Sequence, residues 1–206
     1  MSYEGRGTSL DFPKALEWFN KSSELGHSGA QYNLGVMYEQ GQSVEQDYAK
    51  AFKLYLSSAG QGHVKAQYNL AILYQNGRGT EANFPEAAKW HLESANQGFA
   101  RAQYFYGLLH HMGRGGVERN MATAIEWYRK SMSQGDERAM FNLGLVHIKG
   151  DGVTANKVEA YALLKLSEEK GNEKAAGALE MLLTELDETQ LKEGQSRLTS
   201  LRKELG

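Results

Sequence analysis

Apolar residues recur along this chain at helical spacing, and the pattern itself repeats. Ala30, Leu34 and Met37 occupy positions i, i+4 and i+7, which lie on one face of a helix. The same alanine-led run starts again after 36 or 37 residues, at Ala66, Ala102, Ala139 and Ala175. A fixed period of this length is typical of a stacked array of helical repeats.

A second helical pattern follows each run after a glycine-containing loop. These patterns span residues 14–24, 49–59, 85–96, 121–133 and 157–170. Each is preceded by a residue suited to an N-cap, namely Asp11, Asp47, Asn83, Asn120 and Asn156. Pro13 and Pro85 stand two residues later, where a missing N–H costs little. Each pattern closes on a glycine suited to the left-handed C′ position, at Gly26, Gly62, Gly98, Gly135 and Gly171.

The sequence therefore predicts that each repeat is an antiparallel pair, called here its first helix and its second helix. Small residues stand beside the apolar stripe of the first helices and allow the second helix to approach closely: Gly35, Ala71, Gly107 and Gly144. No segment has a strand pattern. By analogy with other helical-hairpin arrays, we expect an all-α, right-handed superhelical solenoid with about 36 residues per repeat.

We expect one repeat domain over residues 1–206. It comprises a partial repeat at 3–29, full repeats at 30–65, 66–101, 102–138 and 139–174, and a partial repeat with a capping helix at 175–206. In the capping helix Asp187 and Gln190 have the spacing of a capping box. Its apolar stripe consists of Leu191, Leu198, Leu201 and Leu205.

The chain starts with the end of a repeat, because residues 3–8 resemble the loop at 74–80. A solenoid that begins on half a repeat exposes an apolar face. We therefore expect the native chain to extend N-terminally, through further repeats, a removed signal or both. We also expect this end to favour end-to-end self-association.

Composition narrows the class of protein. The 206 residues have a formal net charge of −2 and no basic stripe, which argues against nucleic acid as a partner. The absence of cysteine excludes disulfides, thiolate zinc sites and cysteine nucleophiles. No apolar run reaches the length of a membrane span, and the residues from Met1 to Tyr3 lack the charged and apolar regions of a signal peptide. We expect a soluble protein without membrane insertion.

The repeats resemble the Sel-1-like repeat (SLR) family, a relative of the tetratricopeptide repeats. In one repeat the resemblance rests on Ala30, Leu34, Gly35, Tyr38, Gly41, Val44, Asp47, Lys50, Ala51, Tyr55, Ala59 and Gly62. Gly150, Gly152, Val153 and Asn156 match again, and so do Trp18, Trp90, Trp127 and Tyr128 in the second helices. The sequence departs from the family pattern at His110 and His147, which replace tyrosine, at the inserted Gly116, and at Ser43, where a second glycine is expected.

The resemblance implies a non-catalytic adaptor without a cofactor, which binds a protein or peptide in a concave groove. It also implies a bacterial cytoplasmic or periplasmic protein in envelope or signalling assembly. The alternatives are an immunity protein that neutralises a secreted toxin and, more remotely, an enzyme.

Tetratricopeptide-like geometry predicts which first-helix residues face the groove. They are Tyr32, Val36, Glu39, Lys65, Tyr68, Ile72, Gln75, Arg101, Tyr104, Leu108, His111, Arg138, Phe141, Leu145 and Ile148. An aromatic and aliphatic stripe flanked by Lys65, Arg101 and Arg138 suits a partner segment with some acidic character. The alternative for Tyr32, Tyr68 and Tyr104 is that they are packing residues of the repeat.

Other candidate sites have simpler explanations. His110 and His111 are adjacent and point about 100° apart on a helix, so with His147 they fit a column of stacked aromatics better than a metal site. The glycine-rich loops at 77–79 and 113–116 recur in each repeat and lack a following Gly-Lys-Ser/Thr, which indicates turns rather than phosphate loops. The carboxylates at 168–169 and 185–188 converge on no nucleophile, so no catalytic residue is assigned.

Overall fold

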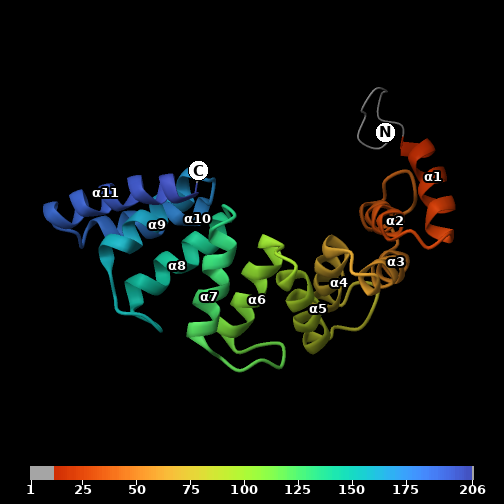
Figure 1. Ribbon diagram of the computed structural model, residues 1–206, viewed down its shortest axis with the longest axis horizontal. Helices are drawn as coiled ribbons and strands as arrows, with labels where there is room; N and C mark the ends of the chain where they lie inside the picture. The colour runs from red at the N-terminus through yellow and green to blue at the C-terminus, as the bar shows by residue number, and fades with distance from the viewer. Residues whose placement is uncertain (1–11, 206) are drawn as a thin grey trace. The chain divides into compact units, whose positions relative to one another are not determined.

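The computed structural model describes residues 12–205, and over this range the chain forms eleven α-helices and no strand (Figure 1). The first helices are α2 (Ser28–Gln40), α4 (Val64–Asn76), α6 (Ala100–Met112), α8 (Glu137–Lys149) and α10 (Glu173–Leu183). The second helices are α1 (Phe12–Glu24), α3 (Tyr48–Gly60), α5 (Phe84–Asn96), α7 (Met121–Met132) and α9 (Lys157–Glu169), and α11 (Glu188–Leu205) follows. The all-α helix-pair fold is confirmed, and the second helices end within two residues of their expected bounds. The expected features at residues 3–8 and the N-cap Asp11 lie outside the described residues.

The chain divides into two compact units, unit 1 (Met1–Gln97) and unit 2 (Gly98–Gly206). In unit 1 a core cluster joins α2, α3 and α4 through residues such as Tyr55, Leu70 and Leu73. In unit 2 two clusters join α7 to α11. No helix in the described range is both long and apolar enough to span a bilayer.

The expected caps fix where the second helices begin. The side chains of Asp47, Asn83, Asn120 and Asn156 each accept a hydrogen bond from the backbone N–H three residues later, at 2.9–3.1 Å. All five expected C′ glycines have positive φ, between 84° and 95°. Because both ends of each second helix are specified locally, the sequence determines its length.

The small residues of the first helices are the points of closest approach within each pair. A Cβ added at Gly35 would lie 2.7 Å from the Tyr55 ring, and one at Gly144 would lie 2.8 Å from Leu164. The expected role of these glycines is therefore confirmed. In the second described pair Ala71 takes the glycine position, and the buried residue that takes the position of Tyr55 is the smaller His91.

Buried serines connect each second helix to the first helix of its pair. The four hydroxyls donate to backbone carbonyls 30 or 31 residues earlier, from Ser58 to Ser28, Ser94 to Val64, Ser131 to Ala100 and Ser167 to Glu137. Glutamine side chains form a second set of contacts, at 2.8 Å from Gln61 to Gln31, Gln97 to Gln67 and Gln134 to Gln103. These polar contacts recur at the same positions and set the register of the pairs.

The C-terminal helix α11 begins at the expected capping box, where Asp187 and Gln190 exchange hydrogen bonds at 2.8 and 3.2 Å. It packs on α9 (Figure 1), and its Leu198 and Leu201 are buried in the core of unit 2. The outer face of α9 carries Ala162 and Leu166, where α7 has the exposed Glu126 and Lys130. This apolar face explains why α11 lies on α9.

Candidate functional site

The predicted groove residues lie on the first helices and differ in exposure. Lys65 and Arg101 are exposed, and most of the others are half-buried. Val36 is 9% exposed and belongs to the core cluster of unit 1, so its side chain contributes to packing. The groove assignment as a whole stays a prediction.

Tyr32 and Tyr104 pack against neighbouring aromatic rings, and each also lines a pocket on the surface. The Tyr32 ring stacks on His63 with centroids 4.7 Å apart and lies 5.9 Å from the Tyr55 ring. Tyr104 lies 5.9 Å from the Tyr128 ring, and its own burial raises the pKa of its phenol. One side of each ring therefore supports the second helix, while the tyrosine also lines a pocket described below.

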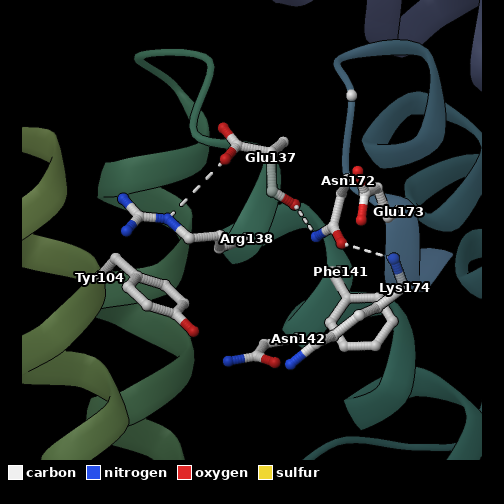
Figure 2. Close-up of a pocket in the computed structure, with 9 residues that line it drawn as sticks. Tyr104, Glu137, Arg138, Phe141, Asn142, Asn172, Glu173 and Lys174 are labelled. Carbon is white, nitrogen blue, oxygen red and sulfur yellow. Dashed lines mark hydrogen bonds and ion pairs between the residues drawn. The ribbon is translucent and has the colours of Figure 1, made fainter.

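A pocket of about 410 Å³ lies in unit 2, on the α6, α8 and α10 side (Figure 2). Its walls are aromatic, polar and charged, and they consist of Tyr104, Glu137, Arg138, Phe141, Asn142, Gly171, Asn172, Glu173 and Lys174. Figure 2 shows Lys174 directing its side chain from α10 toward Asn142 on α8. This arrangement can hold an extended polar segment against an aromatic wall.

The side chain of Arg138 is held by the N-cap residue of its own helix. Asp136, the N-cap of α8, accepts hydrogen bonds from Arg138 Nε at 3.1 Å and Nη2 at 2.6 Å. The guanidinium lies 4.6 Å from the Tyr104 ring centroid, and Figure 2 shows its ion pair with Glu137 at 3.9 Å. Because Asp136 already neutralises it, Arg138 organises the pocket wall more than it offers a free positive charge.

Lys174 continues the basic column and was not among the predicted residues. Lys65, Arg101 and Arg138 occupy equivalent positions in successive first helices, and Lys174 follows at the same spacing. Extending that column by one more repeat would have identified it. The pocket also contains the carboxylates of Glu137 and Glu173, so its charge is mixed.

Unit 1 has a pocket at the equivalent position between α2 and α4. Its volume is about 530 Å³, and it is lined by Gly29, Tyr32, Asn33, Gly62, His63, Val64 and Lys65. His63 Nδ1 accepts a hydrogen bond from the Ala66 N–H at 3.2 Å, and burial lowers the pKa of its imidazole. The lowered pKa favours the neutral imidazole, so Lys65 is the cationic residue of this pocket.

Two of the predicted groove residues, Glu39 and His111, lie near the ends of their first helices and make hydrogen bonds to the second helix of the same pair. Tyr55 Oη donates to Glu39 Oε2 at 2.6 Å, and His111 Nδ1 lies 3.1 Å from Tyr128 Oη. Burial and the bond to Glu39 raise the pKa of the Tyr55 phenol above its usual range. These contacts give Glu39 and His111 a structural role within their pairs.

Several residues considered for other chemistries make structural contacts within residues 12–205. His110 packs edge-on against the Tyr106 ring at 5.0 Å, and the described residues hold no cluster of three or more potential metal ligands. Gly79 lies against the backbone of Tyr48, as expected of a packed turn. Glu168 and Glu185 pair with Lys165 and Lys157.

A family model described as Sel1 repeat matches this chain five times, at residues 1–27, 28–63, 64–99, 100–136 and 137–172. No curated protein sequence matches the chain. Among solved structures, the chain is similar to c5321, a protective antigen of uropathogenic Escherichia coli strains with an SLR fold, at 31% identity and a TM-score of 0.83. That match covers 97% of this chain and 44% of the antigen, so the chain spans less than half of that protein.

Two further structures are similar over most of the chain. A Sel1 repeat protein from Oxalobacter formigenes is 31% identical with a TM-score of 0.75, and the match covers 87% of this chain and 75% of that protein. The immunity protein Pa5087 from Pseudomonas aeruginosa is 20% identical with a TM-score of 0.54, over 90% of this chain and 73% of that protein. The second likeness concerns the fold alone.

Proposed function

This chain belongs to the Sel1 repeat family, and we propose that it is a non-catalytic adaptor that binds a partner protein or peptide along its first helices. Sel1 repeat proteins commonly act as protein–protein interaction scaffolds. The observation that supports this site is the recurrence of one pocket. Each unit has a pocket at the start of its first helices, with an aromatic residue and a lysine at equivalent positions: Tyr32 and Lys65 in unit 1, and Phe141 and Lys174 in unit 2.

A repeated pocket suits a partner that lies along the helices. Tyr32 and Tyr104 offer aromatic walls, while Lys65 and Lys174 offer cations at the rim. Aromatic anchors next to charged rims are common where proteins recognise peptide segments. We propose an extended segment or helix with some acidic character as the partner, and envelope or signalling assembly in a bacterium as the setting.

Charge reversal of the exposed cations tests this site without removing packing. The groove variant replaces three lysines or arginines of the first helices by glutamate, at Lys65, Arg101 and Lys174. The control makes the same change in charge on the exposed side of the second helices, at Lys53, Lys89 and Lys130. Both are compared with the wild type by affinity capture from a lysate of the native source, after circular dichroism has verified their folding.

We expect a partner that the wild type and the control retain and the groove variant loses. A partner lost equally by both variants, or retained by both, would contradict the groove. Turnover of a substrate that one side-chain change abolishes would overturn a non-catalytic function.

The alternative is an immunity protein that neutralises a secreted toxin. The similarity to the Pseudomonas aeruginosa immunity protein adds only a shared fold at 20% identity. Stoichiometric nanomolar binding to a toxin encoded beside this chain would favour immunity, whereas weaker binding to several peptides would favour the adaptor.

A further inference from the structure

The pockets of unit 1 and unit 2 lie at the same place in the repeat but offer different polar groups. Each residue that lines the unit 1 pocket has its equivalent in the lining of the unit 2 pocket. In three of these pairs both side chains are polar, namely Asn33 and Asn142, His63 and Asn172, and Lys65 and Lys174. A comparison of these pairs shows which groups remain available to a ligand.

In the unit 2 pocket, polar groups are engaged within the protein and negative charge is present. Asn172 donates to the Glu137 carbonyl at 3.3 Å and accepts from the Lys174 N–H at 3.1 Å (Figure 2). The carboxylates of Glu137 and Glu173 line the same pocket as the Lys174 ammonium. An anion that entered this pocket would meet both carboxylates and would be repelled by them.

The two asparagines differ because of the residue that the preceding second helix offers. Asn142 hydrogen-bonds to the phenol of Tyr128 on α7. For Asn33 the residue at the position of Tyr128 is Phe19, which has no hydroxyl group. The Asn33 side chain is half-buried and forms no hydrogen bond within residues 12–205. Its amide is therefore available in the unit 1 pocket.

Two further donors of the unit 1 pocket have no acceptor in the part of the chain that the structure describes. His63 Nδ1 accepts from the Ala66 N–H at 3.2 Å, so the proton of the neutral imidazole lies on Nε2. Lys65 is exposed and forms no ion pair with another described residue. No carboxylate is among the described residues that line this pocket. The pocket therefore combines hydrogen-bond donors with one uncompensated positive charge.

We propose that the unit 1 pocket receives an acidic side chain of the partner, glutamate or aspartate, and that the equivalent pocket of unit 2 does not. The two oxygens of a carboxylate match the ammonium of Lys65 and the N–H groups of Asn33 and His63. Tyr32 and Val64 supply apolar surface for the methylene groups that carry such a carboxylate. A chain terminus is disfavoured, because its carboxylate is attached directly to the backbone. Such a site rests on the proposed adaptor function, since the acidic residue belongs to the partner.

The test is an NMR titration of the isotope-labelled 206-residue chain with N-acetylglutamate α-amide, whose only carboxylate is that of the side chain. We expect saturable shifts of the backbone amides of Gly62 and Lys65 and of the Asn33 side-chain amide, and none at Gly171 and Lys174. N-acetylglutamine α-amide, the neutral isostere, should bind at least about fivefold more weakly. N-acetylalanine, whose only carboxylate is that of the main chain, should also bind more weakly.

Two matched variants locate the charge that holds the probe. Lys65→Met keeps an unbranched side chain without its charge and should weaken binding at least about fivefold. Lys174→Met makes the same change in the equivalent pocket and should leave the affinity within about twofold. The spectrum of each variant also reports whether it is folded.

Four results would overturn the acidic-side-chain site. They are equal shifts in both pockets, equal affinity for the glutamine probe, an affinity for N-acetylalanine at least as high as for the glutamate probe, and unchanged binding by Lys65→Met. The titration needs no partner, so its failure is distinguishable from a failure of the adaptor function, which the capture experiment measures.

Discussion

At the residue scale, the pairs are fitted by matching a small residue on one helix to the ring opposite it. Gly35 faces the fully buried Tyr55, while Ala71 is paired with the smaller, fully buried His91. The same pair of positions is therefore filled by glycine with tyrosine in one pair of helices and by alanine with histidine in the next. The additional methyl group of alanine accompanies a smaller ring, as close packing requires.

Gly35→Ala should therefore destabilise the protein by about 1–3 kcal/mol, because the new Cβ overlaps the Tyr55 ring. Adding Tyr55→His should recover part of this loss, since it recreates the Ala71 and His91 combination. Urea unfolding measures both. Gly60→Ala, on a helix surface with nothing within 4 Å, is the control and should be neutral or stabilising. Equal effects of the two alanine substitutions would contradict this explanation.

His91 also makes stability depend on pH. Its burial lowers the pKa of the imidazole to about 4, below the ordinary value of 6.5. The imidazole of the unfolded chain therefore binds a proton more readily than that of the folded protein. The contribution of neutral His91 to folding stability is fully present above pH 6.5 and is lost as the pH falls toward 4. Between pH 6.5 and 5.0 the loss from this residue is about 2 kcal/mol, from about 1.4 kcal/mol per pH unit.

The measurement is urea unfolding at pH 7.5 and 5.0. Ala71→Gly with His91→Tyr recreates the Gly35 and Tyr55 combination and should lose less stability on acidification than the wild type. Other histidines with lowered pKa, such as His63, remain in both proteins and cancel in the comparison. An identical loss in both proteins would show that His91 is not responsible.

Local residue patterns predicted the caps because those contacts lie within three residues of each other. Asp47 and Asn83 cap their helices as expected. The pairing of Asp136 with Arg138 was missed, although both residues are close in sequence. A basic residue two positions after an N-cap can extend to solvent or fold back onto it, and sequence alone does not decide between these directions.

At the scale of elements, the position of α11 depends on the surface that receives it. The apolar stripe predicted a capping helix, and the buried Leu198 and Leu201 confirm the stripe. The stripe alone does not predict that α11 packs on α9. The signal was present in Ala162 and Leu166, which are apolar where other second helices carry exposed charges.

Leu201→Ala tests how much this contact contributes. Leu201 is 1% exposed, and its truncation should cost about 3 kcal/mol through lost burial and a cavity. Lys203→Ala, at an exposed position of the same helix, should change stability by less than about 0.5 kcal/mol. Urea unfolding followed by circular dichroism compares the two. A small effect of Leu201→Ala would mean that α11 packs only loosely on α9.

At the scale of the whole molecule, repetition places equivalent pockets in both units. The period, the helix pairs and the family followed from the sequence because each repeat restates the same pattern. The difference in charge between the two pockets could not be predicted from the repeated pattern. Lys65 stands without a carboxylate in its pocket, whereas Lys174 shares its pocket with Glu137 and Glu173. Which charges meet depends on side chains from several helices, and a single column of the repeat does not contain that information.

The measurement that tests the adaptor function most directly is amide hydrogen exchange of the chain with and without its captured partner. We expect new protection in the first halves of the first helices, around Lys65 in unit 1 and around Arg138 and Lys174 in unit 2, with the second helices unchanged. Protection confined to the second helices, the glycine-rich loops or α11 would contradict a binding surface on the first helices.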